Sequence, residues 1–566
     1  MKRMILVMLI AGACIGASWG AYRAIATPEV PLSRYVPSGS LLYLEAKDFS
    51  SLLTDWNRSK EKQLWLKSGN YEVFSRSRLF LRLDDASKEF SKSAGLPADN
   101  SMLNQVAGSQ SALAIFDIGK LQFLYITRLP SGSSMQSALW QTRGKFETRS
   151  AGGVTFFVRS DPESEREVAF AVNGDYLLLA TRENLMAGAL QLMSGGKENT
   201  VETEGWLSQS VAAAGAPGDL RMVLNLEKIV PSPYFRSYWV QQNITDMKQY
   251  SAGICDLVRS GREYREERVL LKKATSAGEA AAEEKGGTAV AEVLRLVPAH
   301  AAVYEAKANP SAEETFAVLE TKILAPHLGP PVAEKIAPSV ELGNGETGAA
   351  SDLETRIDQP SVRRPASVDV STGMRNLFAK NRVRALLKTQ TTVQNEDDIF
   401  VEIHSGVALL GESDWDEAGV RAALVDYLRP NITTGQLGVE WRTNSGYGEL
   451  DGLWTLAVAA RGKYLLISDQ RELLTEMLGN LKQTSSSKPA VFAAGFNHGL
   501  EHERFMKLAG LLNQSGGTPQ PGGAVDFFTG NVGSLSAALS NFSSETIVVR
   551  DAGNKVLQTA TYEWSH

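Results

Sequence analysis

The stretch Arg34-Tyr-Val-Pro-Ser-Gly-Ser-Leu-Leu-Tyr-Leu-Glu-Ala-Lys47 occurs a second time, in altered form, as Arg295-Leu-Val-Pro-Ala-His-Ala-Ala-Val-Tyr-Glu-Ala-Lys307. In both stretches a Tyr stands seven residues after the Val of Val-Pro, and Glu-Ala-Lys follows. Short strand signals share common residues, so one such match is weak. A second landmark in the same order is needed to indicate a duplication.

That second landmark is present in both halves. Ala171-Val-Asn-Gly-Asp-Tyr-Leu-Leu-Leu179 resembles Gly462-Lys-Tyr-Leu-Leu-Ile467, and each runs into an amphipathic stretch. The interval between the landmarks is longer in the second half, which contains a segment at about 341–368 that is rich in Gly, Pro and polar residues. This composition indicates a flexible surface insert. The sequence therefore predicts an internal repeat.

Each half alternates short apolar runs of period two with stretches of helical period. Short turns between consecutive runs favour antiparallel pairing. The sequence predicts an α+β fold with two pseudo-repeated lobes, each a mainly antiparallel sheet with helices on one side, after an N-terminal membrane or signal helix. Strands are expected in the first lobe at Leu41–Leu44, Ala112–Phe116, Leu121–Ile126, Val154–Val158, Val168–Val172 and Tyr176–Leu179.

The second lobe is expected to add longer helices. Met374–Lys388 and Asp416–Leu428 have helical apolar spacing, and Pro430 is expected to end the latter. Ile399–Ile403 and Val407–Leu410 are predicted as two strands.

Four segments follow from these patterns. Residues 1–26 form a signal peptide or membrane anchor, 27–274 the first lobe, 275–290 a linker and 291–566 the second lobe. The linker is small and polar with glycines near its end, which is typical of a linker or a short exposed helix.

The N-terminal segment predicts export. Lys2 and Arg3 precede residues 4–22, nineteen residues without charge, as in the first two regions of a secretory signal. At about 1.5 Å per residue the segment covers roughly 28 Å, enough to span a bilayer. The positive end should stay in the cytoplasm. We expect the chain on the periplasmic side of the inner membrane, with a retained single-pass anchor favoured over cleavage after Ala24-Ile-Ala26 or lipidation at Cys14.

Three glycines share one face of this segment. Gly12, Gly16 and Gly20 are spaced four residues apart, and small residues at this spacing let membrane helices approach closely. The sequence therefore suggests self-association as well as membrane contact through residues 4–22. The alternative is that small residues are common near signal cleavage sites.

Charge and cysteine content exclude several classes of protein. The chain has 58 Lys+Arg against 64 Asp+Glu and a formal net charge of −6, so it lacks the basic footprint of a nucleic-acid binder. Because Cys14 lies inside the N-terminal segment, Cys255 has no partner in the folded part. We interpret Cys255 as a small buried apolar residue.

One motif resembles a zinc site. His498, Glu501 and His502 form H-x-x-E-H, which is similar to the zinc motif of the pitrilysin-like metallopeptidases. That family uses paired α+β units, and the resemblance implies two His ligands with the Glu as general base. In the family the motif lies early in the first unit and the third ligand is a Glu on a later helix. Here the motif lies near the end of the chain, and the remaining candidates, Glu545 and Glu563, are predicted in strands.

We therefore interpret the two histidines as solvated surface residues and assign no metal, cofactor or catalytic residue. Neither G-x-x-x-x-G-K-[ST] nor a G-x-G-x-x-G between a strand and a helix occurs, so the usual phosphate cradles are missing. A zinc metallopeptidase or a degenerate relative using the motif at 498–502 is kept as the alternative function.

The candidate binding residues are aromatic. Tyr234, Phe235, Tyr238 and Trp239 lie on one helical face after a proline-initiated turn. Such a stripe packs in a core or, if exposed, anchors a partner.

The leader, Val36-Pro37 with Leu41-Leu-Tyr43, and Gly174-Asp-Tyr-Leu-Leu178 resemble a group of exported bacterial proteins whose shared domain has no assigned function. The resemblance implies an exported, two-lobed fold. We expect a non-enzymatic, membrane-anchored protein that binds or scaffolds a partner.

Overall fold

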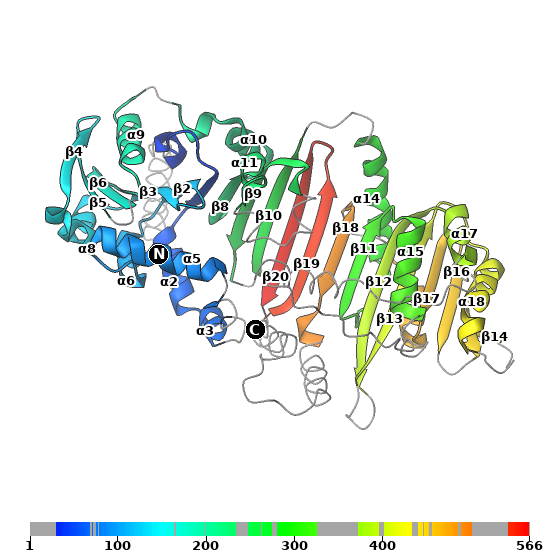
Figure 1. Cartoon of the computed structure of the whole chain (residues 1–566). Coiled ribbons are helices and arrows are strands. Elements are labelled where there is room, and N and C mark those ends of the chain that lie inside the picture. The colour runs from blue at the N-terminus through cyan, green and yellow to red at the C-terminus, as the bar shows by residue number, and fades with distance from the viewer. Residues whose placement is uncertain are drawn as a thin grey trace, which may run out of the picture. The chain divides into compact units, whose positions relative to one another are not determined.

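The structure is a computed structural model, shown in Figure 1. It describes residues 30–67, 71, 75–76, 78–162, 166–196, 199–233, 247–261, 263–273, 280–324, 372–394, 401–432, 440–444, 446–451, 455–484, 488–500 and 542–564. The chain divides into two compact units. Unit 1 comprises Met1–Ser51 and Ala86–Ser208, and unit 2 comprises Leu52–Asp85 and Gln209–His566.

Unit 1 contains an antiparallel sheet in the order β4–β5–β6–β7–β3–β2–β1. Each strand predicted for the first lobe overlaps one of these strands. Their bounds are β1 Leu42–Ala46, β2 Ser111–Asp117, β3 Gln122–Arg128, β4 Glu147–Ala151, β5 Val154–Asp161, β6 Arg166–Asn173 and β7 Tyr176–Ala180. The helices include α6 Asn100–Val106, α7 Ser131–Gln136, α8 Ala138–Gln141 and α9 Glu183–Met193, while α2 Phe49–Arg58, α5 Arg78–Ala94 and α10 Gly205–Ala213 have residues in both units.

Unit 2 contains a longer antiparallel sheet, in the order β8–β9–β10–β20–β19–β18–β11–β12–β13–β17–β16–β15–β14. The strands are β8 Leu220–Asn225, β9 Tyr250–Arg259, β10 Glu263–Lys272, β11 Val303–Ala308, β12 Val383–Gln394, β13 Val401–Gly411, β14 Glu440–Asn444, β15 Tyr447–Asp451, β16 Leu456–Arg461, β17 Tyr464–Ser468, β18 Phe492–Phe496, β19 Phe542–Asp551 and β20 Lys555–Trp564. The helices are α3 Lys60–Leu66, α11 Leu226–Ile229, α14 Ala280–Leu294, α15 Ala312–Leu319, the π-helix η4 Glu320–Leu324, α17 Thr372–Lys380, α18 Glu417–Ile432 and α19 Arg471–Asn480.

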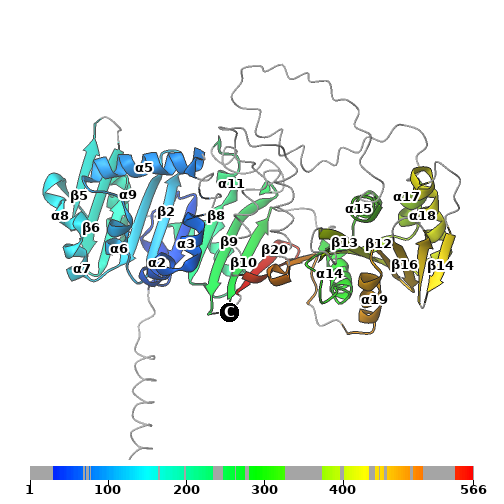
Figure 2. The same ribbon diagram turned by 90° about the horizontal axis from the view of Figure 1, so that it is seen from below.

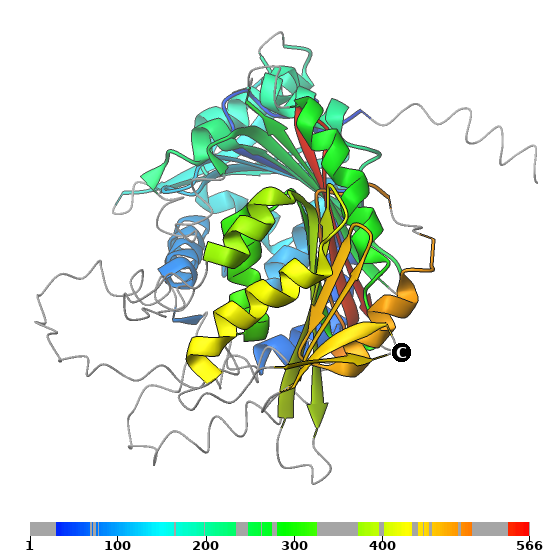
Figure 3. The same cartoon turned by 90° about the vertical axis from the view of Figure 1, so that its right-hand side faces the viewer.

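The α+β class with antiparallel pairing is confirmed, but the prediction of helices on one side is wrong. Leu409 and Leu410, neighbours on β13, belong to two different cores. Successive side chains of a strand point to opposite faces, so both faces of this part of the sheet are covered. Figure 2 shows α15, α17 and α18 on one face and α14 and α19 on the other. Figure 3 shows the yellow helix α18 and the orange helix α19 on opposite sides of the same strands. The sequence carried this information, because Val407–Leu410 has no polar alternate residue.

Two element predictions in this region, one of a helix and one of a pair of strands, are corrected. The predicted helix Met374–Lys388 ends at Lys380, and β12 begins at Val383, where Ala385 and Leu386 face the two cores. The two predicted strands between Ile399 and Leu410 are one strand, β13.

Gly406 stands between the two predicted strands in the sequence, and in the structure it is a packing glycine inside β13. A Cβ there would lie 2.9 Å from Thr389 Oγ1 and 3.0 Å from Met477 Sδ. In α18 the helix continues through Pro430 to Ile432. The proline therefore stands in the last turn of the helix, and the helix ends two residues after it.

The landmark glycines occupy equal positions in two hairpins. Gly174 joins β6 to β7 with φ +57°, and Gly462 joins β16 to β17 with φ +56°. Only glycine adopts this conformation without strain. The hairpin predicted at Asp551-Ala-Gly-Asn554 is also present, between β19 and β20.

Several predictions lie outside the described residues. These include the N-terminal segment 1–26, with Gly12, Gly16 and Gly20, and the insert at about 341–368. Within the predicted linker, α14 begins at Ala280, and its Ala289 and Val290 are fully buried. The lobes predicted at 27–274 and 291–566 partition the chain differently from the two units and stay a prediction. No helix among the described residues has the length and apolar character needed to cross a membrane.

Candidate functional site

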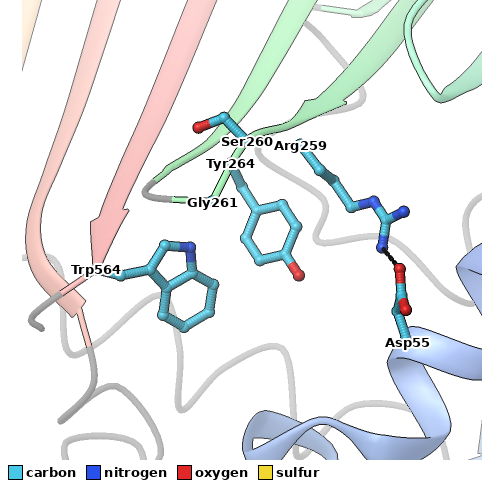
Figure 4. Close-up of a pocket in the computed structure, with 6 residues that line it drawn as sticks. All are labelled: Asp55, Arg259, Ser260, Gly261, Tyr264 and Trp564. Carbon is cyan, nitrogen blue, oxygen red and sulfur yellow. Dashed lines mark hydrogen bonds and ion pairs between the residues drawn. The ribbon is translucent and has the colours of Figure 1, made fainter.

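A pocket lies at one end of the central strands of unit 2. Its walls come from the β9–β10 turn, the first residues of β10, the last residue of β20 and helix α2 (Figure 4). The volume is about 440 Å³. The lining residues are Asp55, Arg259, Ser260, Gly261, Tyr264 and Trp564.

The strand register places these residues together. Tyr264 pairs with Arg259 across the β9–β10 hairpin and with Tyr562 across β10–β20. Directly opposed residues of an antiparallel pair lie on the same face of the sheet, as do residues two apart on one strand. Arg259, Tyr264, Tyr562 and Trp564 therefore share one face, and the short hairpin turn brings Ser260 and Gly261 to its edge.

Two aromatic rings form one wall of the pocket. The Tyr264 and Trp564 rings lie 5.1 Å apart between centroids at an interplanar angle of 70°, an edge-to-face arrangement that aromatic pairs prefer. Both residues are half-buried. The wall therefore offers a broad apolar and π-electron surface to a bound group (Figure 4).

Charged groups form the opposite wall. Arg259 Nη1 donates to Asp55 Oδ2 at 3.2 Å, and Arg259 Nε lies 4.0 Å from Asp219 Oδ2. The backbone N–H of Arg259 also donates to Asp219 Oδ2, at 2.8 Å. One guanidinium thus stands between two carboxylates, so this part of the pocket carries an excess of negative charge.

The same sheet face continues into a cluster of titratable side chains. The β10 residues Glu266 and Arg268 form an ion pair, and Arg268 stands opposite Cys255 on β9. Tyr562 on β20 stands opposite Glu545 on β19. All five side chains are half-buried.

Partial burial shifts three of these groups toward their neutral forms. Burial, and then the charge of Glu266, raises the pKa of the Cys255 thiol and the pKa of Glu545. Burial and the charges of Glu266 and Glu545 raise the pKa of Tyr562. Groups with shifted pKa values gather at functional sites, although ion-pair networks also produce them. A thiol with a raised pKa is a poor nucleophile at neutral pH. Cys255 was predicted to be a buried apolar residue, and in the structure it is half-buried.

One residue of the zinc-like motif borders this cluster. His498 Nε2 lies 4.0 Å from Glu545 Oε2, and its ring stands 4.4 Å from the Phe496 ring between centroids. His498 is half-buried, whereas it was predicted to be a solvated surface residue. Glu501 and His502 lie outside the described residues. Within the described part of the chain, no three His, Cys, Asp or Glu side chains are grouped so as to hold a metal ion.

The predicted aromatic site cannot be compared with the structure, because Tyr234, Phe235, Tyr238 and Trp239 all lie outside the described residues. The sequence analysis missed the pocket residues. The only local signal for them is the β9–β10 turn, where Ser260-Gly261 follows a strand-like stretch.

Comparisons with known proteins give little more. No family model and no curated protein matches the chain. Among solved structures, crystal form I of TP0453 is 11% identical over 44% of this chain and 82% of that chain, with a TM-score of 0.25. Crystal form IV of TP0453 is 12% identical over 44% and 83%, with a TM-score of 0.24. Similarity at this level supports no argument about fold or function.

Proposed function

We propose that this chain is an exported, membrane-anchored protein without enzymatic activity, which binds or scaffolds a partner on the periplasmic side of the inner membrane. The observation that carries the binding role is the pocket bounded by Tyr264, Trp564 and the Asp55–Arg259 pair. Its chemistry is that of recognition: an aromatic wall, fixed charges and a turn at the rim.

The cluster beside the pocket supports binding more than catalysis. A catalytic group needs a pKa suited to its task and a partner that activates it. Cys255 has its pKa raised by burial, and Arg268 is engaged with Glu266. Neither arrangement activates a nucleophile.

Binding is tested with the full-length chain in detergent and a panel of small cations, neutral polyols and anions. A ligand that binds only the folded state stabilises it, by about 2.7 kcal/mol at one hundred times its dissociation constant. We expect at least one class to raise the unfolding temperature of the wild type but not of Trp564→Ala. The control, Trp56→Ala, removes an exposed Trp of α2 that does not line the pocket. If no class gives a shift that depends on Trp564, the binding role is wrong.

Export and anchoring rest on residues 4–22. In intact spheroplasts, added protease should digest the chain, and alkaline carbonate should leave it in the membrane fraction. A chain protected from protease would contradict export, and release by carbonate would contradict anchoring.

We also propose that the fold arose by duplication. The strand order β4–β5–β6–β7–β3–β2–β1 in unit 1 has the same form as β14–β15–β16–β17–β13–β12–β11 in unit 2. Thr181 and Asp469, each directly after β7 or β17, accept matching backbone N–H groups, from Phe123 at 2.8 Å and from Ser405 at 2.7 Å.

The hairpins that follow support the same proposal. β9 and β19 have ten residues each, as do β10 and β20. Gly261 and Gly553 stand at matching places in the two turns. β10 pairs with β20 in antiparallel register, so two corresponding strands lie side by side (Figure 1).

One observation favours the alternative, a zinc metallopeptidase or a degenerate relative. His498 lies beside Glu545, a carboxylate in the later part of the chain, as a third ligand would. Metal analysis of the purified full-length chain separates the two functions. Stoichiometric zinc that is lost in His498→Ala would refute the non-enzymatic proposal, and a metal-free wild type with the same stability as the variant would refute the peptidase.

A further inference from the structure

We infer that the pocket of unit 2 selects ligands that carry an ammonium group. This inference deepens the proposed binding function and rests on it. It follows from three features of the pocket: its aromatic wall, its charge, and its difference from the opposite end of the strands β9, β10, β20 and β19.

The aromatic wall suits a cation. The faces of Trp and Tyr rings carry negative partial charge and attract ammonium groups within about 6 Å of the ring centre, and Trp is the strongest of the aromatic residues. Tyr264 and Trp564 are held at 5.1 Å in an edge-to-face pair. A small cation can therefore contact the face of one ring and remain close to the other.

The fixed charges favour a cation over an anion. Among the described residues that line the pocket, Arg259 carries the positive charge, and it is shared between the carboxylates of Asp55 and Asp219. Asp55 is the more accessible of these, with 61% of its side chain exposed. An anion would meet this excess of carboxylates, whereas an ammonium group is attracted by it.

The opposite end of the same four strands carries side chains of a different kind from those of the pocket. In the matched hairpins, the last residue of β9 is Arg259 and that of β19 is Asp551. The last residue of β20 is Trp564, and that of β10 is Lys272. Lys272 and Asp551 form an ion pair whose side chains are only 16% and 9% exposed. One end is closed by a salt bridge of its own, while the other presents aromatic rings and carboxylates to a ligand.

The test uses three probes of nearly equal shape and different charge: tetramethylammonium, neopentyl alcohol and pivalate. Saturation-transfer NMR on the full-length chain in detergent measures weak binding of each. We expect tetramethylammonium to bind about tenfold more tightly than neopentyl alcohol, the size of effect that a partly desolvated cation–π contact gives. We expect pivalate to bind more weakly than either.

Three pocket variants and one control assign the binding to these residues. Trp564→Ala should weaken tetramethylammonium binding about tenfold, and Trp564→Phe should weaken it less. Asp55→Asn should weaken it about threefold and reduce its dependence on salt, because screening acts on exposed charges. Trp56→Ala, next to Asp55 in the sequence and outside the pocket lining, should leave binding unchanged.

The outcomes separate this inference from the proposed function. If neopentyl alcohol or pivalate binds as tightly as tetramethylammonium in a Trp564-dependent manner, the pocket binds ligands but does not select cations. If no probe and no member of the wider panel binds through Trp564, the binding function fails as well.

Butylammonium and a lysine-containing tripeptide then distinguish the source of the ammonium group: preference for the tripeptide indicates a polypeptide partner, and equal binding indicates a small amine.

Discussion

Removing one partner of the salt bridge between Arg221 on β8 and Asp256 on β9 should strongly destabilise this end of unit 2. Arg221 Nε and Nη2 donate to the two carboxylate oxygens at 2.7 and 2.8 Å. The side chains are 9% and 4% exposed. The N–H of Gly218 also donates to Asp256 Oδ1, at 3.1 Å, and Arg221 Nη2 donates to the carbonyl of Gly215, at 2.9 Å.

The expected magnitude follows from what each substitution leaves behind. Asp256→Ala leaves a buried guanidinium without its counter-charge, and breaking a buried pair in this way costs about 3–5 kcal/mol. Asp256→Asn keeps an acceptor oxygen and should cost about 2 kcal/mol, the worth of a hydrogen bond to a charged group. The double variant Arg221→Met/Asp256→Leu removes both charges, and it should recover most of the loss because apolar replacement of a buried pair is often neutral.

Hydrogen exchange of the β8 and β9 amides, read by mass spectrometry, measures the local opening free energy without assuming that the whole chain unfolds in one step. The reasoning is refuted if Asp256→Ala lowers this free energy by less than about 1 kcal/mol, well under the cost of a broken buried pair. It is also refuted if the loss in the double variant equals the sum of the losses in Arg221→Met and Asp256→Leu alone, since coupled residues must be non-additive.

Three further predictions address the cluster, the duplication and the anchor. Burial and the charge of Glu266 raise the pKa of Glu545, so ionisation of Glu545 lowers the stability of the fold as pH rises through that pKa. Glu545→Gln should therefore raise the unfolding temperature at pH 7 and leave it unchanged well below the ordinary pKa of Glu. An equal rise at both pH values would contradict the pKa shift. Gly174→Ala and Gly462→Ala place a Cβ at φ +57° and +56°. The first Cβ would have no atom within 4 Å, and the second would make an ordinary contact with Asp414 Oδ1 at 3.6 Å. Urea unfolding should therefore show a loss of about 1 kcal/mol for each variant, and clearly unequal losses would argue against equivalent turns. Gly16→Leu should disrupt self-association in membranes if the glycine face is used, and an unchanged cross-linking pattern would rule that face out.

The sequence predicted the elements whose signals are local. Runs such as Tyr176–Leu179 are continuously apolar, are bounded by a turn glycine, and became β7 and its neighbours. The α+β class followed from the shortness of the turns. The tyrosines of the two repeat landmarks, Tyr43 and Tyr304, both stand in strands, β1 and β11.

The sequence-based predictions were wrong where the structure of a segment is decided by its packing against distant residues and not by its local pattern. Gly406, a residue type common in turns, lies inside β13, where Thr389 and Met477 leave no room for a Cβ. Val383–Lys388 fits a helix as well as a strand, and only its pairing with β13 decides. Local pattern carries no information on which neighbour a segment will meet.

The pocket is the extreme case of this limit. Tyr264 and Trp564 lie in opposite halves of the chain, and each by itself is an ordinary strand aromatic. They meet because β10 and β20 pair in antiparallel register, which brings the start of one strand to the end of the other. If the two strands descend from one ancestral strand, the ancestral pair had two identical ends. Under that proposal, divergence of the copies would have converted one end to the Lys272–Asp551 salt bridge and the other to a wall of aromatic rings. A duplicated fold can thus acquire a single asymmetric site when a few residues change at one end of a symmetric strand pair. Trp564→Ala tests that site directly.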